Sequence, residues 1–172
     1  MVTNFLGYLL RFLVLFLVQV LVLNQLNIYG LIAPNLYPLF ILWLPIEIPY
    51  WLLLLAGFFS GLTYDMFSNT AGLNAGATTM LAFVRPVVLR FLKPAGGYEQ
   101  GDLPRLWRMR LPWFISYSLI LFFVHNFYFV VVETFSTGYI GWMILKIISG
   151  TLISTGLALL TEYLLFKRKK IS

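Results

Sequence analysis

The sequence predicts an all-α integral membrane protein with six transmembrane helices in a single domain. Its 172 residues are 60% hydrophobic and only 10% charged, and the mean hydropathy is +0.88. Soluble domains carry about 25% charged residues, so this chain has too few to cover a surface that faces water. The apolar residues also fall into runs whose lengths approach the roughly 20 residues that a helix needs to cross a bilayer.

The first half of the chain is predicted to hold four spans, over about residues 5–26, 32–44, 50–67 and 71–92. The first apolar run is too long for the apolar region of a signal peptide, so we expect it to remain as a span. The second run is short and is interrupted by Pro34, Pro38 and Pro45. These prolines indicate a tilted, kinked or partly re-entrant segment. The third and fourth runs are apolar helices joined by a short polar turn.

The second half is predicted to hold one loop and two further spans. Residues 93–111 are the one long polar stretch, rich in glycine, proline and arginine, and we expect them to form the loop. Spans five and six follow over about residues 112–132 and 139–166, ahead of a basic run at 167–170. No internal repeat is visible, so residues 1–172 are taken as one polytopic domain.

The basic residues predict how the chain is oriented. Lysine and arginine number 12 against 6 acidic residues, and outside the spans they gather in the 93–111 loop and at the C-terminal end. Positive charge in short loops marks the cytoplasmic side, so we expect this loop and both termini in the cytoplasm. No basic face is interleaved with aromatic residues, which argues against a nucleic-acid partner. Cysteine is absent, so the redox compartment cannot be inferred.

Two glycine pairs indicate close helix packing. Gly57 and Gly61 form one G-x-x-x-G pair in span three, and Gly72 and Gly76 form another at the start of span four. Small residues at this spacing let a second backbone approach closely, and such packing replaces the hydrophobic drive that water supplies elsewhere. We expect all four glycines to lie on helix-packing faces.

Ionisable residues at membrane depth are costly, and they usually face a protein interior or a partner. Counting about 1.5 Å per residue places most of those found here in the outer half of the bilayer. The candidate polar anchors or partner contacts are Asp65, Arg85, His125, Glu133 and Lys146.

Several of these residues also have plain structural explanations. Lys146 can extend its amine to the membrane interface along its apolar stem. His125 fits a hydrogen-bonded core histidine better than a metal ligand, because no second histidine or cysteine lies at metal-binding spacing. Glu162, beside the C-terminal basic run, is expected to form a surface ion pair.

Asp65 needs a partner more than the others do. It lies near the C-terminal end of a helix, where the helix dipole disfavours a negative charge. We rank three partners: first the open N–H groups at the start of span four, then Lys146, then Arg85. A structural role and a functional contact both remain open for Asp65 at this stage.

The sequence shows no reaction centre. It contains no Ser/His/Asp grouping, no paired carboxylates at glycosidase spacing and no phosphate-cradling loop. We therefore expect a protein that is not an enzyme, with no catalytic residues, no metal and no cofactor.

Motifs spread over nearly the whole chain resemble a known family. They are residues 61–78 (GLTYDMFSNTAGLNAGAT), 44–45 (LP), 83–86 (FVRP), 125–126 (HN) and 133–135 (ETF). With the length and the six expected spans, they resemble the rod-shape-determining protein MreD family, in its Bacteroidetes-like form. These motifs are diffuse glycine, aspartate and proline positions and carry no catalytic signature.

The resemblance implies a multi-pass subunit of the cell-elongation machinery in the bacterial inner membrane. Such a protein would bind a single-span partner similar to MreC. Through that partner it would connect to the lateral peptidoglycan synthase complex and the cytoplasmic actin-like filament. The resemblance also implies a fold similar to the substrate-binding subunits of energy-coupling-factor transporters, an analogy that does not transfer transport.

A different class of protein remains as the alternative, a substrate-binding membrane subunit of a small-solute, vitamin-type transporter. It predicts a deep cavity lined by tryptophan, tyrosine and asparagine and open to the outside. A scaffold predicts a filled centre with a groove for a second chain, so a structure discriminates between the two.

Overall fold

A computed structural model describes residues 2–26, 34–134 and 140–165, which form helices and no strand. The helices in chain order are α1 (Val2–Leu21), the 3-10 helix η1 (Leu23–Leu26), α2 (Leu39–Leu42), α3 (Tyr50–Ser68), α4 (Leu73–Phe91), α5 (Leu106–Met109), α6 (Leu111–Glu133) and α7 (Ile140–Leu165).

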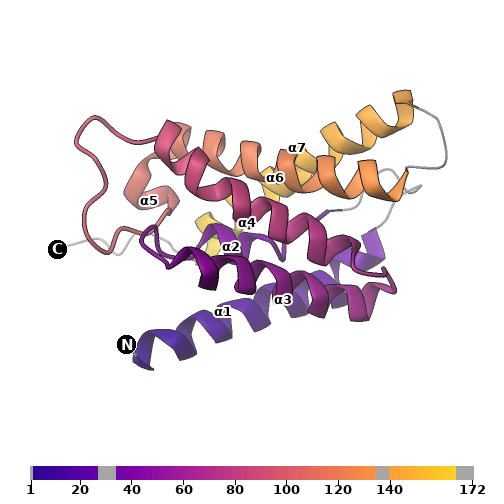
Figure 1. Ribbon diagram of the computed structural model, residues 1–172, viewed down its shortest axis with the longest axis horizontal. Helices are drawn as coiled ribbons and strands as arrows, with labels where there is room; N and C mark the ends of the chain where they lie inside the picture. The colour runs from indigo at the N-terminus through magenta and orange to yellow at the C-terminus, as the bar shows by residue number, and fades with distance from the viewer. Residues whose placement is uncertain (1, 27–33, 135–139, 166–172) are drawn as a thin grey trace.

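The five long helices run side by side along the longest dimension of the molecule (Figure 1). The helices α3 and α4, α4 and α6, and α6 and α7 pack against one another in sequence. The start of α1, the loop that carries α5, and the end of α7 lie at the same end of the bundle (Figure 1). The turn between α3 and α4 lies at the opposite end.

Four helical stretches are long and apolar enough to cross a bilayer: Gly7–Gln25, Tyr50–Ser68, Leu111–Glu133 and Ile140–Leu165. The chain is therefore a multi-pass helical membrane protein. The helix α4 has a similar length but contains Asn74, Arg85 and Arg90, which lower its hydropathy. Because α4 packs between α3 and α6, its polar side chains can face protein while its neighbours face lipid.

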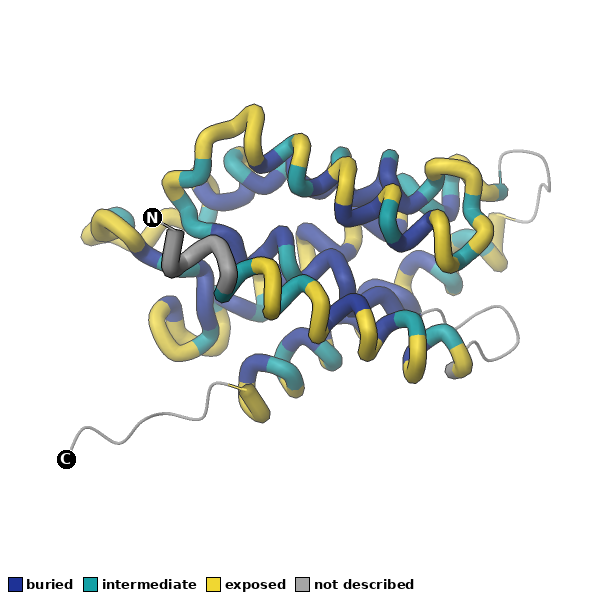
Figure 2. Tube along the Cα trace, turned by 90° about the horizontal axis from the view of Figure 1, so that it is seen from below, coloured by how far each residue is buried: buried dark blue, intermediate teal, exposed yellow. Residues whose placement is uncertain are grey.

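The outer surface of the bundle is apolar. Buried residues line the sides of the helices that face one another, and exposed residues lie on the outer sides (Figure 2). Those exposed positions include Leu21, Met66 and Phe91, which are 67%, 79% and 85% exposed. A contiguous apolar surface of this extent suits lipid rather than water.

The expected second span does not form a transmembrane helix, although the irregular path that its prolines indicated is present. Its residues 32 and 33 lie outside the described part of the chain. The remainder holds one helical turn, α2, and is otherwise non-helical. Residues 34–44, here called the central segment, are buried except for the half-buried Phe40. Proline at positions 34, 38 and 45 explains the irregularity, because proline donates no backbone hydrogen bond and limits the preceding residue.

The central segment runs through the bundle rather than around it. At one end, the Asn35 N–H donates to Ser154 Oγ of α7 (3.0 Å). Two residues beyond its other end, the Ile46 N–H donates to the carbonyl of Asp102 in the α4–α6 loop (3.3 Å). Between these ends Leu39 and Trp43 join the hydrophobic core formed by the long helices. Irregular backbone is tolerated at membrane depth only where protein surrounds it, and this segment meets that condition.

Candidate functional site

Asp65 caps the start of α4. Its Oδ1 accepts the backbone N–H of Asn74 (3.0 Å) and its Oδ2 accepts that of Ala75 (2.8 Å). The Asn74 side-chain amide (3.0 Å) and the Thr70 hydroxyl also donate to Oδ1. The two helices can meet in this way because Gly72, with φ at 84°, turns the chain back at the N-cap position of α4. The first-ranked partner from the sequence is therefore confirmed.

The two lower-ranked partners of Asp65 are engaged elsewhere. Lys146 forms an ion pair with Glu133, which joins the start of α7 to the end of α6. Their side chains are 17% and 36% exposed, so this pair lies nearer the surface of the bundle than Asp65 does. Arg85 lies deeper in the bundle and binds the central segment. The carboxylate of Asp65 is instead held by helix N–H groups, whose positive dipole end favours an anion.

A buried tyrosine connects Asp65's neighbours to His125. The Tyr37 hydroxyl lies 2.8 Å from Thr78 Oγ1, 2.9 Å from His125 Nε2 and 3.2 Å from Asn74 Oδ1. Thr78 already donates its proton to the Asn74 carbonyl (2.8 Å), so Thr78 Oγ1 and Asn74 Oδ1 are both acceptors for the one proton of Tyr37. Tyr37 then accepts from His125, so Nε2 of His125 is the donor in this hydrogen bond. His125 is fully buried, which confirms the expectation of a hydrogen-bonded core histidine.

Further polar side chains hold the beginning of the central segment. Gln19 of α1 donates to the Pro34 carbonyl (2.9 Å) and accepts from the Leu36 N–H (2.6 Å). The Asn35 side chain donates to Asn126 Oδ1 of α6 (3.1 Å). Sequence reasoning missed these residues as a site. The available signal was the presence of glutamine and asparagine inside or beside apolar runs, where each buried polar group needs a partner.

Arg85 holds the end of the central segment. Its side chain is fully buried, with Nε donating to the Tyr117 hydroxyl (2.8 Å) and the terminal nitrogens donating to the carbonyls of Leu44 and Pro45. Tyr117 in turn donates to the Leu42 carbonyl (3.1 Å). Arginine suits this role because its planar group carries five donors in a fixed arrangement.

Glu162 corrects the expectation of a surface ion pair. It is fully buried and lies 3.6 Å from the guanidinium of Arg105, which precedes α5. Arg105 also lies over the Trp43 ring, 4.5 Å from its centroid. The C-terminal basic run lies outside the described residues. The pair links α7, the α4–α6 loop and the central segment. Burial lowers the pKa of Arg105, and the nearby Glu162 carboxylate partly offsets that shift.

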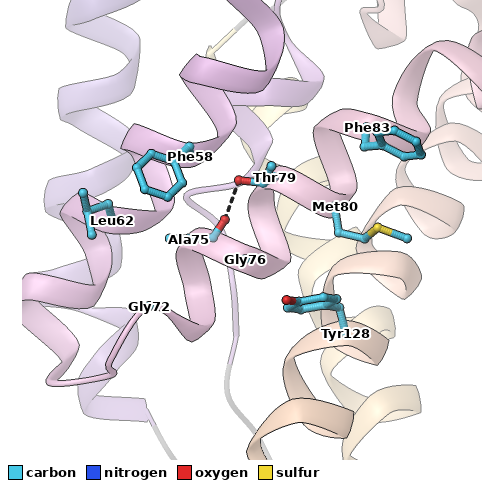
Figure 3. A pocket seen from close by; sticks show the side chains of 9 residues that line it. All are labelled: Phe58, Leu62, Gly72, Ala75, Gly76, Thr79, Met80, Phe83 and Tyr128. Atoms are coloured by element: carbon cyan, nitrogen blue, oxygen red, sulfur yellow. Dashed lines mark hydrogen bonds between the residues drawn. The ribbon is translucent and has the colours of Figure 1, made fainter. Parts of the chain in front are cut away.

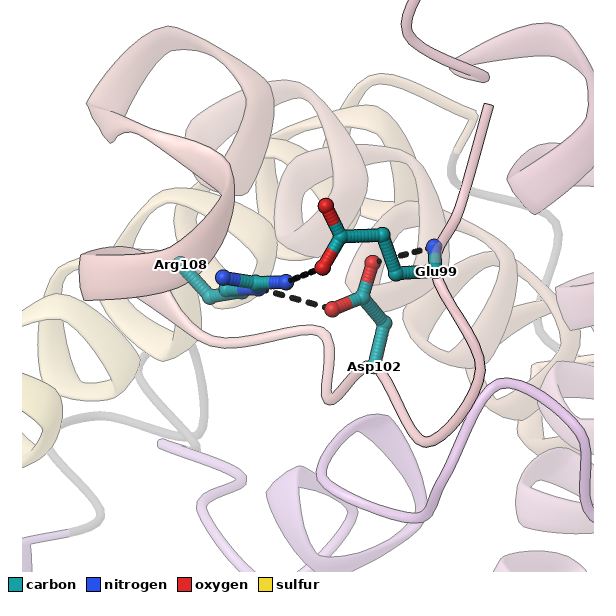
Figure 4. Close-up of polar contacts among 3 residues, drawn as sticks. All are labelled: Glu99, Asp102 and Arg108. Carbon is teal, nitrogen blue, oxygen red and sulfur yellow. Dashed lines mark hydrogen bonds and ion pairs between the residues drawn. The ribbon is translucent and has the colours of Figure 1, made fainter. Parts of the chain in front are cut away.

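The α4–α6 loop carries its own polar cluster (Figure 4). Arg108 forms ion pairs with Glu99 and Asp102, at 2.7 Å between its Nε and Asp102 Oδ1. The Glu99 N–H donates to the other oxygen of Asp102 (2.8 Å). These hydrogen bonds, that from Arg108 first, lower the pKa of the Asp102 carboxyl group, and the two acids raise the pKa of Arg108. The cluster gives the loop a defined shape.

The glycine pairs differ in their roles. A Cβ at Gly57 would lie 2.9 Å from Ala82 Cβ, and one at Gly61 would lie 2.6 Å from Ala75 Cα. These two residues therefore let α3 and α4 pack closely, as expected. For Gly72 the expectation is wrong: a Cβ there would meet nothing within 4 Å, and the residue serves the turn instead. A Cβ at Gly76 would meet the Tyr128 ring of α6 at 2.8 Å.

A groove opens on the lipid-facing side beside Gly76 (Figure 3). This Gly76 groove has a volume of about 510 Å³. Its lining residues come from α3, the turn, α4 and α6: Phe58, Leu62, Gly72, Ala75, Gly76, Thr79, Met80, Phe83 and Tyr128. The Thr79 hydroxyl donates to the Ala75 carbonyl (2.7 Å), so this hydroxyl is engaged within α4. A floor of small residues between bulky rims can accept another helix.

The polar side chains of this site join helices to one another and to the central segment. In the described residues, no three His, Cys, Asp or Glu side chains are grouped to hold a metal ion. The buried ionisable groups bind backbone or one another. Their geometry fixes the central segment and the start of α4, which is the role of polar groups that give a helical membrane protein one specific packing.

The fold and this buried polar core define the class: a multi-pass helical membrane protein with a largely irregular segment, containing one helical turn, through its centre. Comparisons of the chain with protein-family models, with curated proteins and with solved structures give no match.

Proposed function

We propose that this protein is a non-enzymatic scaffold subunit of the bacterial cell-elongation machinery, similar in role to the MreD family. It binds a single-span partner similar to MreC, and through that partner it meets the peptidoglycan synthase complex and the actin-like filament. The proposal rests on the motifs described above and on one structural observation, the filled centre of the bundle.

The filled centre supports a scaffold over a solute-binding subunit. The central segment occupies the middle of the bundle, where Tyr37, Leu39, Ile41 and Leu42 are all fully buried. Hydrogen bonds hold both ends of the segment. Gln19 binds Pro34 at the first end, and Arg85 binds Leu44 at the other. A solute would have to displace this segment and break those hydrogen bonds. Interaction surfaces on the outside need no such rearrangement.

We propose that the chain lies in the inner membrane and crosses it six times, with both termini in the cytoplasm. Five crossings are the long helices and the sixth is the central segment. The α4–α6 loop contains Arg105, Arg108 and Arg110 and lies at the same end as the start of α1 and the end of α7. The positive-inside tendency supports the cytoplasmic assignment of that end.

The Gly76 groove is the proposed surface for the partner's helix. Its floor is small, its rims are the exposed Phe58 and Phe83, and it spans the α3–α4 hairpin that Asp65 holds together. Close backbone approach over such a floor favours a helix over lipid chains, because helix association in lipid depends on packing.

Site-specific photo-crosslinking tests this function. A photoreactive residue at Phe83, on the groove rim and 54% exposed, is expected to form an adduct with a single-span elongation protein in native membranes. The same residue at Leu160 of α7, 52% exposed, is the control and should give no such adduct. Mass spectrometry of the adduct identifies the partner.

Two glycine substitutions, one in the groove and one outside it, test whether the crosslinked contact is needed for rod shape. Gly76→Leu extends into the groove from a Cβ that already meets Tyr128 at 2.8 Å, whereas the Cβ of Gly156→Leu on α7 meets nothing within 4 Å. We expect Gly76→Leu to lose the Phe83 adduct and to fail in restoring rod shape to depleted cells, with membrane abundance unchanged. Normal rod shape and partner binding by a folded Gly76→Leu variant would reject the proposed function.

A further inference from the structure

The helices α1 and α3 converge at one end and separate at the other (Figure 1). Where they converge, the Phe16 and Phe67 rings meet edge to face, with centroids 5.2 Å apart. Where they separate, a groove of about 450 Å³ lies between them. Phe40 of the central segment lies in this α1–α3 groove, with its ring 5.1 Å from that of Phe12.

The walls of the α1–α3 groove require no polar partner. Ser60 and Thr63 line it, but their hydroxyls donate back to the carbonyls of Gly57 (3.0 Å) and Phe59 (2.7 Å). The rest of the lining is aromatic or aliphatic. Unlike the Gly76 groove, it offers no glycine floor for a helix backbone. An apolar chain fits these walls better than a solute or a helix does.

The length of the groove matches one leaflet. Its lining on α3 runs from Leu52 to Thr63, which is about 16 Å along a helix. Half of a hydrocarbon core of about 30 Å is about 15 Å. The groove therefore extends from the membrane surface beside the start of α3 to near the bilayer centre, as an acyl chain of one leaflet does.

A cation lies at the surface end of the groove. Tyr8 lines the groove, and the guanidinium carbon of Arg11 lies 5.4 Å from the Tyr8 ring centroid. Arg11 is half-buried, and its charge also acts on the nearby Glu162 and Arg105. An apolar slot of leaflet length with a positive charge at its surface end complements an anionic amphiphile.

We propose that the α1–α3 groove binds one acyl chain of an anionic phospholipid, and that Arg11 pairs with the headgroup of that lipid. The lipid belongs to the leaflet beside the start of α1. This site is separate from the Gly76 groove and does not depend on the proposed scaffold function.

Native mass spectrometry of the purified protein tests the site. The probe is an equimolar mixture of phosphatidylglycerol and phosphatidylethanolamine with identical acyl chains, added in mild detergent. Wild-type protein should retain one phosphatidylglycerol in preference. Arg11→Gln should lower the retained phosphatidylglycerol-to-phosphatidylethanolamine ratio about fivefold. Ala56→Phe, which fills the groove from α3, should lose both lipids.

Two control variants separate the groove from general surface effects. Arg90→Gln removes an exposed arginine from α4, and Gly156→Phe adds a ring to the open face of α7. Both should bind lipid as wild type does. Thermal unfolding checks each fold, and Ala56→Leu replaces Ala56→Phe if the larger ring prevents folding.

Three results would overturn the proposal. The wild type could show no preference between the lipids, or Arg90→Gln could lower the ratio as much as Arg11→Gln. The third is that the folded Ala56 variant retains lipid normally. Loss of a co-purified single-span protein from that variant, with lipid retention unchanged, would assign the groove to a helix instead.

Discussion

At the scale of single residues, two buried charges are stabilised without an ion pair between them. Asp65 is 5% exposed and Arg85 is fully buried. The carboxylate accepts hydrogen bonds from the start of α4, and the guanidinium donates to carbonyls of the central segment. Each charge therefore satisfies backbone groups that would otherwise lack partners in a medium without water. The charges determine where irregular chain meets regular helix.

Substitutions of Asp65 should separate capping from charge. Asp65→Leu leaves two backbone N–H groups without an acceptor, and we expect it to lower the free energy of unfolding by roughly 3–5 kcal/mol. Asp65→Asn keeps one acceptor oxygen, but its NH2 group replaces the other oxygen and faces a backbone N–H of α4. We expect this variant to lower the free energy of unfolding by about 1–3 kcal/mol. Unfolding in mixed detergent micelles measures both. Equal losses would show that charge dominates, and wild-type stability of Asp65→Leu would show that the cap is dispensable.

Arg85 and Lys146 form a matched comparison of buried and exposed cations. Arg85→Met removes the donors for Leu44 and Pro45, and we expect a loss of at least about 2 kcal/mol. Lys146→Met breaks a partly exposed pair with Glu133, so its effect should stay below about 1 kcal/mol. The same unfolding assay applies. The opposite order would mean that Lys146, near the start of α7, is the cation that stabilises the fold more.

At the scale of elements, the α3–α4 hairpin depends on one close approach. Gly61→Ala would place its Cβ 2.6 Å from Ala75 Cα and push the helices apart. Gly72→Ala meets no atom within 4 Å and only strains a backbone with φ at 84°, at a cost of about 1–2 kcal/mol. We expect the lower unfolding midpoint for Gly61→Ala. A lower midpoint for Gly72→Ala would mean that turn shape, and not helix contact, limits the hairpin.

The α4–α6 loop should depend on pH through Asp102. Its carboxyl pKa is lowered in the folded loop, so the stabilisation is present above the unfolded pKa of about 3.9 and is lost as the pH falls through the folded pKa. Hydrogen exchange of the Glu99 amide, which donates to Asp102, reports this after correction for intrinsic rates. Protection should hold from about pH 7 to about pH 4 and fall below that. Asp102→Asn should remove the step, and an unchanged step in that variant would exclude Asp102 as its source.

The sequence predicted the long helices well and the central segment poorly. The expected spans 50–67 and 112–132 lie within one residue of Tyr50–Ser68 and Leu111–Glu133, because apolar length alone decides such helices. Hydropathy does not reveal whether residues 34–44 are helical. Their backbone groups bind Gln19 and Arg85, and these contacts exist only in the folded bundle.

The same distinction applies to the candidate site. Asp65 and its partners lie nine and ten residues apart, so the turn between two helices made the contact predictable. Asn35 and Ser154 lie 119 residues apart, and no local pattern joins them. Gly72 was misassigned for a related reason, because G-x-x-x-G spacing does not distinguish a packing face from a turn.

At the scale of the whole molecule, the account depends on a bundle whose interior is filled by its own chain. The central segment replaces a spanning helix, and polar side chains from α1, α4, α6 and α7 hold it in place. A scaffold gains from this arrangement because its outer grooves keep a fixed shape. A solute-binding subunit would need the same space empty.

Single-cysteine labelling measures most directly whether the interior is filled. The chain has no native cysteine, so Ala77→Cys, at a fully buried position of α4, carries the one thiol in the protein. Asn69→Cys in the exposed α3–α4 turn and Gly97→Cys in the α4–α6 loop serve as reactive controls, and they also report the two sides of the membrane. With a membrane-impermeant thiol reagent, we predict that Asn69→Cys reacts from outside, Gly97→Cys reacts only after the cytoplasmic side is opened, and Ala77→Cys reacts only after denaturation. Rapid labelling of Ala77→Cys in the folded protein from the outer side would contradict the filled interior and favour a solute cavity.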